Sequence, residues 1–153
     1  MKRLHVSLAV SDIERSRAFY SALFGSEPTF ERGRYVQWLL DDPRVNFVIE
    51  QGAGTAGLSH LGVQVAEEDE LEAQFGRVAE AGGAVFDEGE TTCCHARSTK
   101  NWTADPDGVR WETFLTHERT GEYGTPAAFV MDNANEDEDL RPAEKASGAR
   151  CCG

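Results

Sequence analysis

Two histidines and one glutamate stand at positions from which they could bind a single metal ion. His5 and His60 each lie in a stretch of alternating apolar residues, and Glu112 lies in a third such stretch. Two imidazoles and one carboxylate on the same side of an octahedral ion leave open positions for oxygen and a substrate, and this facial triad favours non-haem Fe(II). A lone inward histidine is usually an ordinary core residue, so the hypothesis depends on elements that bring the three together.

Strand alternation determines the direction in which the two histidines point. In the stretch 4–10, every second residue is apolar and is expected to pack on a helix, which leaves His5 on the opposite face. The stretch 59–65 has the same pattern, and it leaves His60 on the opposite face in the same way. Both histidines are therefore predicted to face one cleft.

The two histidine-bearing stretches begin two similar units, about 55 residues apart. Each is followed by a capped helical segment, 13–24 or 67–81, that stops at glycine. Strand candidates follow each helix: 29–32, 34–40 and 45–51 in the first unit, and 84–88, 99–104 and 109–116 in the second. The chain is therefore predicted to be an α+β protein with two tandem βαβββ modules that form an open, barrel-like metal cleft.

Apolar spacing predicts the side of each helix that packs on its sheet. These residues are Ile13, Phe19, Tyr20, Leu23 and Phe24 in the first helix and Leu71, Phe75, Val78 and Ala79 in the second.

When the last strands of the two modules are aligned, Glu112 occupies the position that Val48 occupies in the first module. A fully symmetric site would have two histidines and two carboxylates, so one carboxylate is replaced by valine. His95 and His117 lie outside the repeated positions and are given no role as metal ligands.

The repeat covers residues 1–116, with modules of about 1–55 and 56–116. Residues 117–153 form an acidic tail that is expected to be mobile, because its apolar residues follow no period.

The amino-acid composition limits the classes of partner that the protein can bind. The chain of 153 residues has 27 acidic and 15 basic residues and a formal net charge of −12, which argues against nucleic acid or an anionic membrane surface as a partner. No apolar run approaches the roughly 20 residues that span a bilayer, and the amino terminus has no signal-peptide pattern. We expect a cytoplasmic protein that acts on a small molecule as a monomer or homodimer.

The four cysteines form two adjacent pairs, Cys93-Cys94 and Cys151-Cys152. Neighbouring cysteines cannot join distant segments, and in a reducing compartment they are expected to be free thiols. The first pair lies between two strand candidates, on a predicted loop that could close over the cleft.

The duplicated modules and the three ligand positions resemble the vicinal oxygen chelate superfamily of glyoxalases, bleomycin resistance proteins and extradiol dioxygenases. The segment 91–97, with its cysteine pair, followed by 100–102 and 105–112, is similar to the organoarsenical carbon–arsenic lyases and the related cadmium-inducible proteins. Many chemistries share the metal triad, so the cysteine pair is the sharper signal. The resemblance implies the vicinal oxygen chelate fold over residues 1–116.

The resemblance also implies an Fe(II)-dependent lyase that uses dioxygen to cleave the carbon–arsenic bond of trivalent organoarsenicals, releasing inorganic arsenite. Methylarsenite is the expected substrate, with aromatic arsenicals as further candidates. His5, His60 and Glu112 would hold the iron and form the catalytic centre, and Cys93 and Cys94 would bind arsenic. Thiol chemistry agrees, since trivalent arsenic is a soft centre and soft ligands select soft partners.

Other interpretations remain open at this point. The chain could be a cadmium- or arsenite-binding stress protein without turnover, or a glyoxalase- or fosfomycin-resistance-type enzyme on the same fold. The first cysteine pair could be a plain surface dipeptide, and Cys151-Cys152 could deliver metalloid or bind it adventitiously. His95 also departs from the related lyases, in which a tyrosine is expected after the pair.

Overall fold

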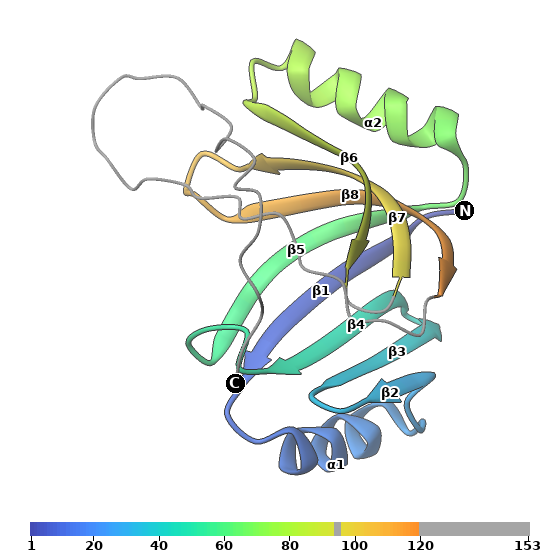
Figure 1. Ribbon diagram of the computed structural model, residues 1–153, viewed down its shortest axis with the longest axis vertical. Helices are drawn as coiled ribbons and strands as arrows, with labels where there is room; N and C mark the ends of the chain where they lie inside the picture. The colour runs from blue at the N-terminus through green and yellow to red at the C-terminus, as the bar shows by residue number, and fades with distance from the viewer. Residues whose placement is uncertain (94–95, 120–153) are drawn as a thin grey trace.

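The computed structural model describes residues 1–93 and 96–119 and contains two βαβββ modules in succession (Figure 1). The first module consists of β1 (Arg3–Val10), α1 (Ile13–Phe24), β2 (Phe30–Arg32), β3 (Tyr35–Asp41) and β4 (Arg44–Gln51). The second consists of β5 (Gly57–Val65), α2 (Glu68–Glu80), β6 (Val85–Cys93), β7 (Ala96–Ala104) and β8 (Arg110–Arg119). This order confirms the predicted duplication.

All eight strands form one sheet in the order β2-β3-β4-β1-β5-β8-β7-β6. The two modules join where β1 and β5 pair in antiparallel fashion at the centre of the sheet. The outer strands β2 and β6 are not paired to each other, so the sheet is unclosed, and the two helices lie at opposite ends of the molecule (Figure 1). The predicted α+β architecture is therefore confirmed.

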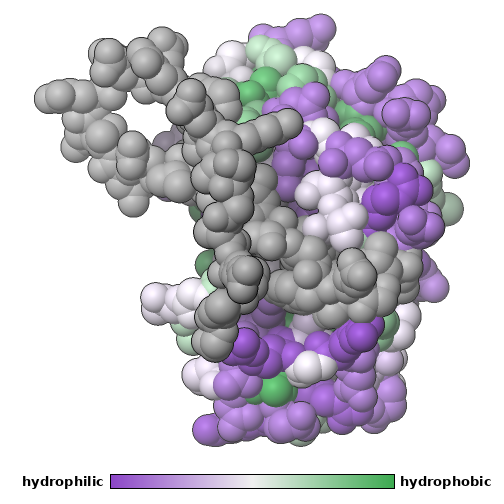
Figure 2. All heavy atoms as spheres, in the orientation of Figure 1, coloured by the Kyte–Doolittle hydropathy of each residue, from purple (hydrophilic) through white to green (hydrophobic). Residues whose placement is uncertain are grey.

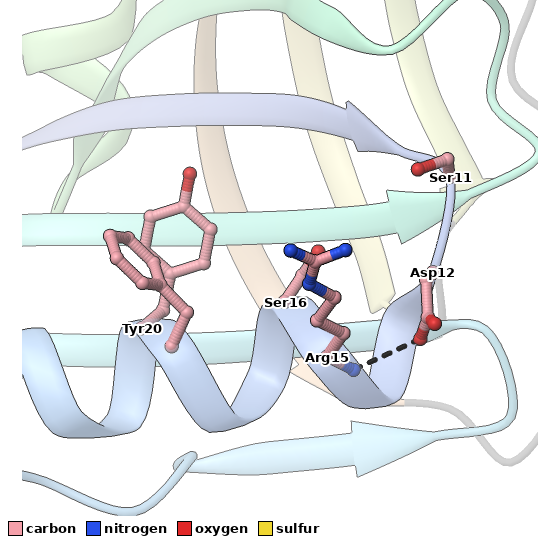
Figure 3. A pocket seen from close by; sticks show the side chains of 6 residues that line it. Ser11, Asp12, Arg15, Ser16 and Tyr20 are labelled. Carbon is pink, nitrogen blue, oxygen red and sulfur yellow. Dashed lines mark hydrogen bonds between the residues drawn. The ribbon is translucent and has the colours of Figure 1, made fainter.

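The first module has a dense core between α1 and its sheet. Its buried residues are Ile13, Val36, Trp38, Val45, Phe47 and Ile49, and Tyr20 and Phe24 of α1 pack against them. The predicted caps of α1 are present, because the Asp12 carboxylate accepts a hydrogen bond from the backbone N–H of Arg15 (Figure 3) and Gly25 ends the helix with φ +60°. Burial of this apolar face holds α1 on the sheet.

The second module packs its helix less densely. Leu71 of α2 and Val65 of β5 are buried, whereas the residue of β7 that corresponds to Trp38 is the half-buried Thr103. The Thr103 hydroxyl donates a hydrogen bond to the carbonyl of Ala84. The buried aromatic residues of this module, Trp102 and Phe114, lie instead next to the histidines.

The predicted apolar faces of the helices are wider than the real ones. Phe19 and Leu23 of α1 are 60% and 62% exposed, and Ala79 of α2 is also exposed. Only part of each predicted face contacts the sheet, because the sheet covers Ile13, Tyr20 and Phe24 but does not reach the flank that carries Phe19 and Leu23.

The predicted loop is wrong for residues 89–93 and 96–98, because the two flanking strands extend through them, whereas Cys94 and His95 lie outside the described residues. Strand β6 continues to Cys93 and β7 begins at Ala96, with these two residues paired across the ladder. The sequence pattern underestimated both strands since polar, β-branched threonines replace apolar alternation in this region. Strand β8 also extends to Arg119, so residues 117–119, assigned above to the tail, belong to the sheet. The rest of the tail lies outside the described residues.

The face shown in Figure 2 is largely hydrophilic wherever the described residues are visible, as the acidic composition predicts. Within the described part of the chain, neither helix has the length and hydrophobicity needed to cross a bilayer.

Candidate metal centre

His5, His60 and Glu112 come together on three neighbouring strands, β1, β5 and β8. They lie on the face of the sheet opposite the helices, because Val6 and Leu8, the alternate residues of β1, pack against the α1 core. The two imidazole Nε2 atoms are 3.2 Å apart, and Glu112 Oε2 lies 3.7 Å from that of His5 and 3.5 Å from that of His60. The structure therefore unites the three predicted residues.

The strand registers confirm the alignment of Glu112 with Val48. In the parallel pair β1–β4, Val48 lies opposite Ser7, and in the parallel pair β5–β8, Glu112 lies opposite Gly62. A Cβ atom at position 62 would lie 2.5 Å from the carbonyl oxygen of Glu112, so this position must be glycine for β8 to approach.

Hydrogen bonds at the far side of each ring orient the histidines. His5 Nδ1 donates to the backbone carbonyl of Asn46 at 3.0 Å, which leaves the lone pair on Nε2. His60 Nδ1 is 3.1 Å from the Ser59 hydroxyl. Both rings thus turn Nε2 toward the carboxylate, and such outer contacts are what fixes a histidine for metal binding.

The Asn46 side chain belongs to a chain of neutral amides on the same face. Gln37 Nε2 donates to Asn46 Oδ1 at 2.7 Å, and Asn46 Nδ2 donates to Gln64 Oε1 at 3.1 Å. These side chains hold the strand segment whose carbonyl anchors His5.

Lys100 of β7 adds a cation that the sequence analysis missed. Its Nζ donates to Glu112 Oε1 at 2.6 Å, and both side chains are buried. A signal was present, because alternation along β7 places Lys100 on the same face as Trp102 and Ser98, where a lysine requires a partner.

Burial and charge set the protonation of the cluster. Burial lowers the pKa of His5 from 6.5 to about 4, and the nearby Glu112 carboxylate only partly offsets this effect. Burial by itself would raise the pKa of Glu112, but Lys100, His60 and His5 outweigh it and hold that pKa below its ordinary value. At neutral pH the site therefore presents a neutral His5 and a charged carboxylate, the forms that bind metal.

Two aromatic rings border the histidines. The Phe114 ring meets His5 edge-on with centroids 5.1 Å apart, and Trp102 meets His60 in the same way at 5.1 Å. Trp102 Nε1 donates to Glu88 Oε2 at 2.6 Å, which fixes the indole. Phe114 was not predicted as part of the site, although it lies two residues after Glu112 on the same face of β8.

The donor set fits a divalent transition metal. Metal–nitrogen and metal–oxygen bonds of about 2.0–2.2 Å place two ligand atoms at right angles roughly 3 Å apart. The three donor atoms are separated by 3.2, 3.5 and 3.7 Å, so each separation needs to close by less than about 1 Å around one ion. Imidazole and carboxylate together suit iron, manganese or zinc.

Of the four cysteines, the structure describes only the backbone of Cys93. The backbone of Cys93 ends β6 opposite Ala96. The other cysteines and one histidine lie outside the described residues: Cys94, His95, Cys151 and Cys152. His117 is exposed, with Nε2 2.8 Å from the Thr99 hydroxyl.

A surface pocket at the start of α1 is separate from this cluster. It is lined by Ser11, Asp12, Arg15, Ser16, Phe19 and Tyr20, and none of the three metal-ligand candidates belongs to it (Figure 3). Asp12 is occupied there in capping the helix, so the pocket adds nothing to the site.

The chain is similar in sequence to one protein family and to several proteins of known name. The family model of the Glyoxalase/Bleomycin resistance protein/Dioxygenase superfamily matches residues 2–113. The chain is 37% identical over 160 residues to a protein of Bacillus sp. (strain MD1) named trivalent organoarsenical cleaving enzyme, with 99% of each chain covered. It is 36% identical over 126 residues to cadmium-induced protein CadI of Mycobacterium tuberculosis (strain ATCC 25618 / H37Rv), with 82% of this chain and 83% of that protein covered.

Solved structures show the same fold at low identity. An extradiol ring-cleaving dioxygenase from B. fuscum superimposes with a TM-score of 0.58 and 19% identity, covering 77% of this chain and 33% of the other. The family match, the two relatives and the duplicated fold agree. The chain therefore belongs to the Glyoxalase/Bleomycin resistance protein/Dioxygenase superfamily, in the family of the organoarsenical-cleaving and cadmium-induced relatives.

Proposed function

We propose that the protein is an Fe(II)-dependent lyase that uses dioxygen to cleave the carbon–arsenic bond of trivalent organoarsenicals and releases inorganic arsenite. The observation that carries the proposal is the cluster of His5, His60 and Glu112, in a chain 37% identical to a trivalent organoarsenical cleaving enzyme over 99% of both lengths. Methylarsenite is the proposed substrate, with aromatic arsenicals as further candidates. We place the enzyme in the cytoplasm, as a monomer or homodimer.

In this proposal the cluster holds the iron through His5 Nε2, His60 Nε2 and Glu112 Oε2. Ferrous iron, when bound, supplies dioxygen chemistry at the positions that the three protein ligands leave open. The carbonyl of Asn46 keeps His5 in the metal-binding tautomer. His5 and Glu112 are 6% and 3% exposed, so the sheet keeps bulk water from the inner side of the site.

Two further groups of residues would handle the substrate. The rings of Trp102 and Phe114 border the histidines and offer apolar surface to the organic group on arsenic. The thiolates of Cys93 and Cys94 are proposed to hold the arsenic atom. Soft sulfur ligands match a soft trivalent centre, and the backbone of Cys93 lies at the end of β6, on the hairpin whose other strand carries Trp102.

Serine variants test the thiol assignment. Cys93→Ser and Cys94→Ser should each retain iron but lose binding of methylarsenite, because a serine hydroxyl is a hard and un-ionised ligand at neutral pH. Tryptophan fluorescence during titration with methylarsenite measures binding, and an iron assay runs beside it. The matched control is the double variant Cys151→Ser/Cys152→Ser, expected to change binding much less. If both single variants bind and cleave methylarsenite like the parent, the arsenic assignment is wrong.

A second candidate is a cadmium- or arsenite-binding stress protein without turnover, which the 36% identity to cadmium-induced protein CadI favours. Oxygen uptake separates the two. The lyase consumes oxygen only when both Fe(II) and methylarsenite are present, whereas a sequestering protein binds its metal without any uptake.

A further inference from the structure

We infer that Lys100 positions Glu112 so that the carboxylate offers one oxygen, and not two, to a bound metal ion. The inference rests on the proposed metal centre. Lys100 Nζ donates to Oε1 at 2.6 Å, whereas Oε2 faces the Nε2 atoms of His60 and His5 at 3.5 and 3.7 Å. The two carboxylate oxygens therefore have separate partners before any ion binds, and only one of them points into the cluster.

The internal repeat shows that this pair is a feature of the second module alone. In the second module, Lys100 lies opposite Phe114, the residue two positions after Glu112. In the first module, Tyr35 lies opposite Glu50, the residue two positions after Val48, so Tyr35 corresponds to Lys100. The strand position itself therefore does not require a lysine. The lysine is found in the module that has the carboxylate, and a tyrosine is found in the module that has valine in its place.

The chemistry of carboxylates gives this pairing a consequence. A carboxylate can bind a metal through one oxygen or through both. With three protein ligand atoms an octahedral ion keeps three positions open, and a carboxylate bound through both oxygens would fill one of them. The Lys100 ammonium occupies a lone pair of Oε1, and its positive charge repels a cation that approaches this oxygen. Lys100 thus preserves a coordination position for oxygen or substrate.

A purely structural role for Lys100 predicts something different. If the lysine only neutralised the buried charge of Glu112, its removal would lower the stability of the fold and leave the coordination of a bound ion unchanged. The number of open positions on the ion therefore separates the two roles, and stability does not.

Mn(II) is the probe, because relaxation of water protons by bound Mn(II) reports the exchangeable waters on the ion. In Lys100→Met, which keeps the length and burial of the side chain, relaxation per bound Mn(II) should fall by about a third, since two of three open positions remain. The matched control is Tyr35→Phe, a buried substitution at the corresponding register, which should keep the parent value. A Lys100→Met protein that binds Mn(II) with the parent relaxation overturns the inference.

A second measurement needs no variant at position 100. The infrared difference spectrum between Mn(II)-bound and Mn(II)-free parent protein, assigned with Glu112→Gln, should show the wide separation of carboxylate stretches that one-oxygen binding gives. A narrow separation, typical of two-oxygen binding, overturns the inference while the metal centre stands. If the parent binds no Mn(II), the metal centre itself fails and the role of Lys100 with it.

Discussion

The two modules share one topology but differ on both faces of their sheets. Toward its helix, the first module has Trp38 and Phe47, whereas the corresponding residues of the second are Thr103 and Trp111. Trp38 is fully buried, but Thr103 and Trp111 are only half-buried. The first module therefore contributes the larger share of the apolar burial that stabilises the fold.

On the opposite face the difference is reversed. The first module presents Tyr35, Gln37 and Val48, and the second presents Lys100, Trp102 and Glu112 at the same registers. The face of the first module is linked by hydrogen bonds between neutral amides, and the face of the second holds a buried ion pair beside both histidines. The two modules therefore differ in function: the first contributes most of the apolar burial that stabilises the fold, and the second contributes the buried charged residues of the candidate metal centre.

Removing a metal ligand from the second module should have the largest effect. His60→Ala is expected to weaken metal binding by more than about 100-fold, since losing even an outer contact to a ligand costs about 10–100-fold. Isothermal titration with Mn(II) measures the affinity, and thermal unfolding should show that the fold survives. His117→Ala, which removes an exposed histidine of the same module, is the matched control. Undiminished binding in His60→Ala would remove His60 from the site.

Removing an aromatic residue from the first module should instead damage the fold. Trp38→Ala is expected to lower the free energy of unfolding by about 3–5 kcal/mol, because it leaves a cavity in the core. The same substitution at the corresponding position of the second module, Thr103→Ala, removes one hydrogen bond and should cost about 1 kcal/mol. Urea unfolding measures both values, and equal losses would contradict the unequal division of stability.

Acid should weaken the metal-free protein through the cluster. The pKa of His5 is about 4 in the folded state and 6.5 in the reference state, so between these values the unfolded chain takes up a proton that the folded chain refuses. Stability therefore falls as pH decreases from 6.5, by at most about 1.4 kcal/mol per pH unit. Glu112, whose folded pKa lies below its reference value of 4.5, acts in the same direction at lower pH.

Urea unfolding of metal-free protein between pH 6.5 and 4.5 isolates the contribution of His5. The His5→Gln variant should show a flatter decline than the parent over this range. A parent whose stability is constant or rises as pH falls would show that His5 is not buried in its neutral form.

The sequence was sufficient to predict the repeat and the cluster for a physical reason. Strand side chains alternate with a period of two, so a histidine among alternating apolar residues must lie on the face opposite them. Because the repeat gives His60 the same position as His5, both histidines are predicted to lie on the same face. Alignment of the last strands then located Glu112 against Val48, and the registers agree with it.

The pairing of Lys100 with Glu112 could not be predicted in the same way. Lys100 lies opposite Phe114 and Trp102 lies opposite Glu112, so the lysine reaches the carboxylate only through the course of its long side chain, which strand alternation does not give. The flank of α1 was also misjudged, because hydrophobic spacing does not show how far the sheet extends beneath a helix.

The measurement that tests the central claim most directly is the speciation of arsenic after reaction. Protein is loaded with Fe(II) without oxygen, mixed with methylarsenite, exposed to oxygen, and the arsenic products are separated and identified. The account predicts inorganic arsenite from the iron-loaded parent, and none from metal-free protein or from iron-treated His60→Ala. Inorganic arsenite formed at the parent rate by the His60→Ala protein, or methylarsenite left intact by the iron-loaded parent, would contradict it.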